Sequence, residues 1–228
     1  MSYETISVAP IAGALGAEVS GADLARKLPD ATIAEIRQAL LAHLVIFFRD
    51  QHLTPEQHLA LGRRFGPLQV HDFVEAMPDY PEILEVRKEP GETRNFGGGW
   101  HTDVSYLERP SLGSLLYALE APEYGGDTLF ANQCLAYETL SDGMKQILDG
   151  LTAMHSARRP YGINAARAQE YGPSSMRFNF SEKAHDEIVS ANGSRQQRFP
   201  FCMGLRGSWN RTLHRIVYAN DLSKNDND

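Results

Sequence analysis

An imidazole and a carboxylate stand two residues apart near the middle of the chain, at His101 and Asp103. If this stretch is extended, the pleat sends both side chains to the same face, where they converge. A nitrogen and an oxygen donor placed in this way are two of the three ligands of the facial triad that holds non-haem Fe(II). The spacing therefore predicts part of an iron site. A surface turn is the alternative, because a His-x-Asp pair arises easily by chance in a chain with 8 histidines.

The composition limits the class of protein that can carry such a site. The 228 residues suffice for one large domain or two small ones with a substantial core. A net charge of −7 argues against nucleic acid or an anionic membrane as partner, while a small anionic ligand stays compatible. Cys134 and Cys202 are far apart and imply no disulfide framework, which fits a reducing compartment. The N-terminus does not resemble a signal peptide, and the apolar run at 40–48 is too short to span a bilayer. A soluble cytoplasmic protein is expected.

Helices are predicted at three places from capping residues and periodicity. Asp30 is expected to cap a helix whose apolar residues repeat at helical spacing up to about residue 41. Thr54 and Gln57 form a capping box that begins a second helix, which should run to about Phe65. Apolar residues at helical spacing predict a third helix over 136–151.

Strands are predicted between these helices, without a regular βαβ rhythm. The run at 44–48 is continuously apolar and is expected to be a buried strand. The glycine-containing stretch 88–99 is expected to be a mobile loop, with the glycines 97–99 as a lid hinge beside the metal. An antiparallel sheet or barrel with helices on its outside follows from this order. The predicted strands cover residues 6–10, 44–48, 82–86, 114–119 and 128–130.

Five motifs follow one another along the chain. They are Gly16-Ala17-Glu18-Val19-Ser20-Gly21-Ala22-Asp23-Leu24, Phe47-Phe48-Arg49-Asp50-Gln51, Arg64-Phe65-Gly66, Trp100-His101-Thr102-Asp103 and Tyr124-Gly125-Gly126-Asp127-Thr128-Leu129-Phe130. In this order they resemble the Fe(II)/α-ketoglutarate-dependent taurine and dichlorophenoxyacetate dioxygenases. The resemblance runs from about Ile6 to about Glu187 and implies an α+β, mostly β fold, a double-stranded β-helix (jelly roll) with flanking helices. We therefore expect a dioxygenase domain at 1–187 and an atypical, partly disordered segment at 188–228.

The resemblance also implies an activity and roles for matching residues. Fe(II), α-ketoglutarate (2-oxoglutarate) and O₂ would be used to hydroxylate an unactivated C–H bond of a small, anionic organic substrate, with release of succinate and CO₂. His101 and Asp103 match the metal ligands, and Thr128 matches a threonine that holds the far carboxylate of α-ketoglutarate, an ordinary strand threonine being the alternative. His71 matches a substrate-pocket histidine, with a plain loop position as the alternative. The family's tyrosine three residues later is replaced by Val74, which argues against taurine itself.

The third metal ligand is the least regular part of the match. His214 lies in a segment, 209–215, that resembles the family's Trp-Asp-Asn-Arg-x-x-x-His with one residue missing, and the interval from Asp103 is short. His214 is thus either the third ligand or a loop histidine, and His185 is a weaker substitute. No arginine stands at the family's position after the histidine to pair with the far carboxylate of α-ketoglutarate.

Two explanations of this ending stay open. In a compact variant, His214 closes the triad and Arg211 or Arg215 binds the carboxylate. In a truncated or frameshifted family member, the fold is incomplete at its C-terminus, and exposed strand edges favour self-association. That variant would be a catalytically impaired remnant that binds metal weakly or not at all. A zinc hydrolase with the same ligands is disfavoured, because no HExxH motif accompanies them.

Overall fold

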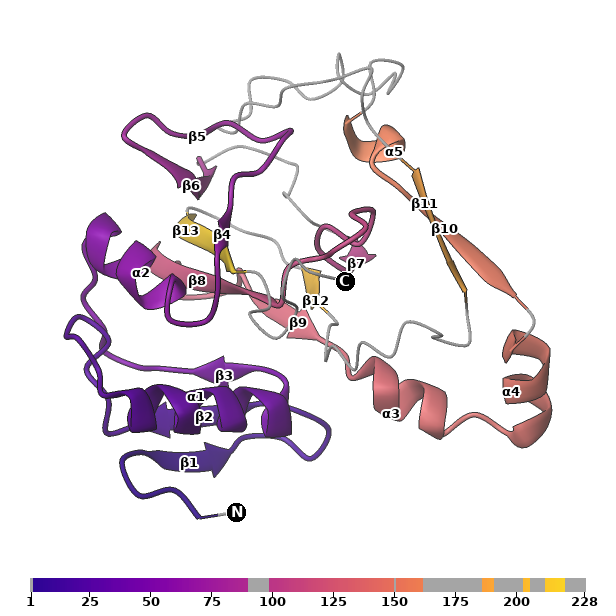
Figure 1. The fold of residues 1–228 in the computed structure, drawn as a ribbon, viewed down its shortest axis with the longest axis horizontal. Helices are drawn as coiled ribbons and strands as arrows, with labels where there is room; N and C mark the ends of the chain where they lie inside the picture. The colour runs from indigo at the N-terminus through magenta and orange to yellow at the C-terminus, as the bar shows by residue number, and fades with distance from the viewer. Residues whose placement is uncertain are drawn as a thin grey trace, which may run out of the picture.

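The computed structural model describes residues 2–89, 99–149, 151–161, 186–190, 203–205 and 212–219, the last three ranges by their backbone alone. These residues form four β-sheets and five helices, in which neighbouring strands are antiparallel except for one pair (Figure 1). Within these residues, no helix is long and apolar enough to cross a membrane. The antiparallel arrangement with helices outside it agrees with the prediction.

The first layer is a small sheet covered by one long helix. Strands β1 (Ser7–Pro10) and β2 (Ala17–Ser20) are antiparallel, and β3 (Ile46–Phe47) pairs with β2 in parallel. Helix α1 (Asp30–His43) buries Ile33, Ile36 and Ala39 as part of the main core cluster of the protein. The strand predicted at 6–10 is confirmed from Ser7 to Pro10, at the edge of this sheet.

Two details of this layer differ from the prediction. Asp30 is the first helical residue and not the cap, because Pro29 holds the cap position and the Asp30 carboxylate pairs with the Arg64 guanidinium. The strand predicted over 44–48 contains Ile46 and Phe47 only, and both are half-buried. It lies at the edge of its sheet. Leu44, with φ 69° and ψ −36°, ends α1 in a γ-turn, in which the Val45 N–H bonds to the His43 carbonyl at 2.8 Å, instead of beginning the strand.

Helix α2 (Pro55–Gly62) confirms the predicted capping box. The Thr54 hydroxyl accepts from the Gln57 backbone N–H, and the Gln57 side chain accepts from the Thr54 N–H. The helix ends three residues earlier than predicted, because the N–H groups of Arg64 and Phe65 bond to carbonyls three residues back.

A five-stranded sheet lies behind α2 and is organised around its last strand. One edge of β13 (Thr212–Ala219) pairs with β6 (Tyr80–Lys88) over residues 212–217 and with β4 (Leu68–Gln69) over residues 218–219. The other edge of β13 pairs with β8 (Gly113–Glu120). β5 (Ala76–Met77) completes the sheet through β6. The predicted strands at 82–86 and 114–119 are confirmed, while the strand β13 lies in the segment predicted to be atypical.

A three-stranded sheet carries the His-x-Asp motif. β12 (Met203–Leu205) lies between β7 (Trp100–His101) and β9 (Thr128–Phe130), the last of which confirms the strand predicted at 128–130. Of the loop predicted at 88–99, residues 90–98 lie outside the described part of the chain.

An arm on one side of the molecule holds the remaining elements (Figure 1). α3 (Gln133–Glu138) and α4 (Asp142–Asp149) replace the single helix predicted over 136–151. The Thr139 hydroxyl bonds to the carbonyls of Leu135 and Ala136, and the Ser141 hydroxyl accepts from the Met144 N–H, so the two hydroxyls end one helix and begin the next. β10 (Thr152–Ser156) then pairs with β11 (Asp186–Ser190) and leads into α5 (Arg158–Tyr161).

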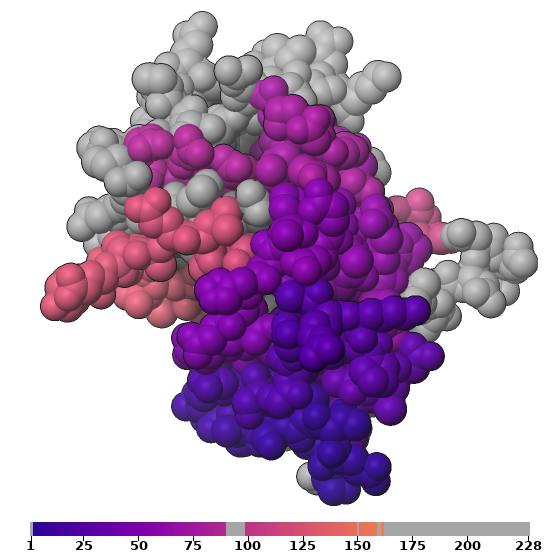
Figure 2. All heavy atoms as spheres, turned by 90° about the vertical axis from the view of Figure 1, so that its left-hand side faces the viewer, coloured from indigo at the N-terminus to yellow at the C-terminus, as the bar shows by residue number. Residues whose placement is uncertain are grey.

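Figure 2 shows residues of the N-terminal part as an unbroken surface over the lower and middle part of one face. The predicted domain boundary at residue 187 falls inside β11. Of the predicted atypical segment at 188–228, only 188–190, 203–205 and 212–219 lie within the described residues. The division into two domains stays a prediction.

Candidate metal centre

His101 and Asp103 meet at the end of β7. The Nε2 atom of His101 lies 3.1 Å from the Oδ1 atom of Asp103, and both side chains are partly exposed. The carbonyl oxygen of Gly99 accepts a hydrogen bond of 2.8 Å from the Nδ1–H of His101. The convergence that the spacing predicts is present, although only His101 belongs to the strand and Asp103 begins a turn.

The two donors fit a metal ion held in an octahedral shell. Ligands about 2.1 Å from such an ion and at right angles to each other lie about 3 Å apart, which is the separation of these two atoms. Because Nδ1 carries the proton given to Gly99, the lone pair of Nε2 is available on the side of Asp103, an orientation typical of metal-binding histidines. Without a metal, the hydrogen bond to Asp103 is the main reason that the pKa of His101 is raised.

The turn after the ligands is strained. Val104 has φ 45°, a left-handed conformation that a β-branched residue rarely adopts and that costs about 1–3 kcal/mol. Its side chain is nevertheless buried, packed in a small cluster with Phe73, Tyr106 and Ala157. The Leu107 N–H closes the turn on the Val104 carbonyl at 3.0 Å. The strain therefore persists because surrounding groups hold Val104 in place.

Aromatic rings form one side of the centre. Phe73 and Tyr161 are stacked with their ring centroids 4.9 Å apart, and Tyr106 lies edge-on to Tyr161 at 6.2 Å. Burial is the main reason that the pKa of Tyr106 is raised, so its hydroxyl stays protonated at neutral pH. The rings exclude water from one flank of the Asp103 turn.

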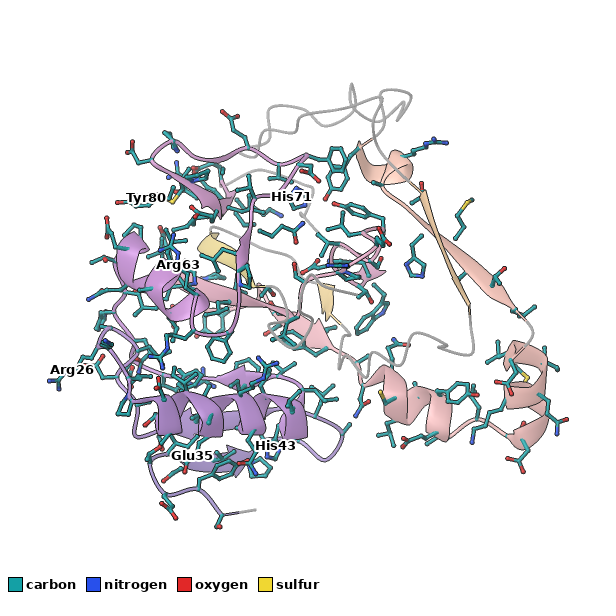
Figure 3. All side chains as sticks on the ribbon, in the orientation of Figure 1. Arg26, Glu35, His43, Arg63, His71 and Tyr80 are labelled. Carbon is teal, nitrogen blue, oxygen red and sulfur yellow. The ribbon has the colours of Figure 1, made fainter. Side chains whose placement is uncertain are left out.

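His71 joins this aromatic group from the connection between β4 and β5. Its ring centroid lies 5.6 Å from that of Tyr161, and the residue is buried (Figure 3). Nδ1 accepts from the backbone N–H groups of Phe73 and Val74 at 3.1 and 3.2 Å, so the proton of the neutral ring is on Nε2. Desolvation lowers the pKa of His71, although the charges of Asp72 and Asp103 oppose that shift. His71 is therefore a buried loop residue, and its substrate-binding role stays a prediction.

Thr128 shares a face with His101. Residues directly opposite each other in a sheet point to the same side, and Met203 of β12 is opposite both His101 and Phe130. Thr128 is two residues from Phe130 on β9, so it lies on that same side. Two strand spacings put β9 about 10 Å from β7.

The remaining predicted ligands lie where side chains are not described. His214 belongs to β13, with Val86 of β6 on one side and Ala118 of β8 on the other, so its backbone is in a strand and not in a loop. His185 lies outside the described residues. Among the side chains that the structure describes, no group of three metal-ligating residues occurs.

Sequence reasoning did not find the residues that surround the two ligands. Phe73 and Tyr161 are distant in sequence from the ligands, and Tyr106, only three residues after Asp103, belongs to no motif. The pairing of Ser105 with His155 joins residues fifty positions apart. His58, outside this centre, is buried with its Nε2 3.2 Å from the Leu115 carbonyl.

Comparison with known proteins identifies the class to which this fold and site belong. The profile of the taurine catabolism dioxygenase TauD, TfdA family matches residues 7–222, beyond the limit near residue 187 expected from the motifs. A taurine dioxygenase from Burkholderia xenovorans superposes with a TM-score of 0.67 and 26% identity, over 96% of this chain and 90% of that one. The fold is thus the expected double-stranded β-helix.

Curated relatives agree with this class. An α-ketoglutarate-dependent sulfate ester dioxygenase from Pseudomonas putida is 35% identical over 68% of this chain and 51% of the relative. An alkylsulfatase from Acinetobacter baylyi is 36% identical over 70% of this chain and 50% of the relative. The chain spans about half the length of these relatives, and it belongs to the TauD/TfdA dioxygenase family.

Proposed function

We propose that this protein is an Fe(II)- and α-ketoglutarate-dependent dioxygenase that hydroxylates a small anionic organic substrate and releases succinate and CO₂. The observation that supports it most strongly is the 3.1 Å approach of His101 Nε2 to Asp103 Oδ1, in a chain of this family. When bound, the iron and cosubstrate supply the oxidising chemistry that side chains cannot. O₂ and the small molecule are the expected partners; a cytoplasmic location and self-association remain predictions.

His101, Asp103 and His214 are the proposed ligands. Gly99 fixes the imidazole of His101 by accepting from Nδ1, and the turn at Val104 aims the Asp103 carboxylate at Nε2. β13 brings the backbone of His214 into the sheet that also contains β6 and β8. Thr128, on the same side of its sheet as His101, would donate its hydroxyl to the far carboxylate of α-ketoglutarate.

His71 is proposed to bind the substrate anion. With Nδ1 occupied by two backbone N–H groups, its Nε2–H is the donor, and the low pKa keeps the ring neutral. A neutral donor beside an aromatic wall suits an organic anion such as a sulfate ester, on which one curated relative acts by name. Val74 next to it provides an apolar surface in place of a tyrosine.

The test is anaerobic addition of Fe(II) and α-ketoglutarate to the purified chain. An assembled site gives a weak visible charge-transfer band, which His101→Ala abolishes and the exposed control His52→Ala leaves unchanged. Succinate release is then measured with alkyl sulfate esters, sulfonates and aryloxy acids. A folded protein that shows no band and releases no succinate would be the impaired remnant instead.

A further inference from the structure

We propose that His155 is a positioning residue for the metal centre, which acts through Ser105 to hold the strained turn that carries Asp103. The proposal rests on the metal-binding role above. Two contacts carry it: a hydrogen bond of 2.9 Å between His155 Nδ1 and Ser105 Oγ, and the packing of Ala157 against Val104.

The strain at Val104 creates the need for such a support. A valine released from its neighbours would leave the left-handed region, because that conformation costs about 1–3 kcal/mol for a residue of this shape. Rotation of the Val104 backbone would swing the preceding residue, Asp103, whose Oδ1 lies 3.1 Å from His101 Nε2. The position of the carboxylate therefore depends on what holds the two residues that follow it.

β10 and the bend just after it provide two such contacts. His155 is the fourth residue of the strand, and Ala157 follows its last residue, Ser156. His155 contacts Ser105 through its ring, and Ala157, which is fully buried, packs in the cluster that contains Val104. Met154, one residue before His155 on the strand and therefore on its opposite side, is 67% exposed.

The alternative is that β10 only adds stability to the fold. A residue of that kind would lower the melting temperature when changed but leave the metal affinity of the folded protein as it was. A partner that orients a metal ligand typically changes affinity by about 10–100-fold. Metal affinity and melting temperature together separate the two roles.

The experiment titrates the purified chain and its variants with Mn(II), with free Mn(II) followed by its EPR signal. Ser105→Ala and His155→Leu are each expected to weaken Mn(II) binding about tenfold. The double variant should bind no more weakly than either single one, because both remove the same bond. His155→Asn, whose amide reaches the position of Nδ1, is expected to restore most of the affinity, and Met154→Ala serves as the control on the same strand.

Several results would overturn the proposal. One is wild-type affinity, within twofold, in folded Ser105→Ala and His155→Leu; this would leave the proposed function intact. Another is additive loss in the double variant, or a failure of His155→Asn to recover. A wild-type chain that binds no Mn(II) at all would overturn the proposed function as well. If His155→Leu does not fold, the proposal is still tested by the other two variants. Ser105→Ala must bind Mn(II) more weakly than the wild type, and His155→Asn must bind it with most of the wild-type affinity.

Discussion

The N-terminal region and the region around the metal centre are built in different ways. Residues of the first layer and α2 contribute to one cluster of ten buried side chains, from Ile6 to Phe65. The cluster beside the metal ligands has four, and α3 and α4, every residue of which is described, bury none. One region stabilises itself by packing, whereas the other is held by individual hydrogen bonds and a few ring contacts.

This difference shows how a site can be placed on a weakly packed part of a fold. A turn in a strained conformation needs neighbours that fix it, and those at Val104 come from the β4–β5 connection, from β10 and from the chain just after it. Variants in the first region should accordingly change stability most, and variants in the second region should change it less. The four predictions below test that separation.

The largest effect is expected in the N-terminal core. Ile36→Ala should lower the free energy of unfolding by about 2–5 kcal/mol, because Ile36 is 2% exposed and its removal leaves a cavity. Ile147→Ala in α4, where the side chain is 63% exposed, should change it by less than about 0.5 kcal/mol. Urea unfolding followed by circular dichroism measures both. Equal losses at the two positions would remove the contrast between the regions.

Equivalent helix caps in the two regions should differ next. Thr54→Ala should cost about 1 kcal/mol of global stability, because the capping box of α2 begins a packed helix. Asn132→Ala removes the side-chain oxygen that accepts from the Leu135 N–H at the start of α3, whose residues are not buried, together with the bond of the Asn132 amide to the Ala14 carbonyl. Its expected result is faster amide exchange within α3, with little change in the urea midpoint. A larger global loss from Asn132→Ala would contradict the comparison.

The third effect is limited to acidic solution. The pKa of His71 is lowered by burial, so below its ordinary value near 6.5 the unfolded chain binds a proton that the folded chain does not. The contribution of the neutral His71 ring to the free energy of unfolding should therefore be fully present above about pH 6.5. It should be lost as the pH drops toward the lower pKa of the folded state. Melting temperatures from pH 8 to pH 5 should fall less steeply for His71→Asn than for the wild type. Parallel curves would indicate that His71 is not buried as a neutral ring.

The smallest effect is expected on the surface of α4. Ile147→Lys should leave the free energy of unfolding within about 0.5 kcal/mol, because the exposed position can place a charge in water. Analytical ultracentrifugation of the same variant tests the predicted self-association. A dimer that dissociates on this substitution would mean that the exposed face of α4 is covered in solution.

The amino-acid sequence determined the features that depend on neighbours in the chain. The capping box at Thr54, the alternating strand at 82–86 and the approach of His101 to Asp103 all arise between residues at most a few positions apart, where backbone geometry alone sets the contacts. Family motifs, which are also local, were enough to indicate the double-stranded β-helix. Errors occurred where competing short-range bonds decided a boundary, as at Thr139 and Ser141, whose hydroxyls divide one predicted helix in two.

Only the tertiary structure decided which distant residues surround the metal ligands. His71, Tyr161 and His155 reach the Asp103 turn from separate elements, and no spacing in the chain relates them. β13 lies at the centre of the larger sheet, although the sequence that flanks it is polar and aperiodic. Its backbone N–H and C=O groups are paired by β6 and β8, which are distant in the chain, so the flanking residues do not decide its place. Long-range contacts of this kind depend on how sheets and helices pack, and packing is a property of the whole chain that no short pattern contains.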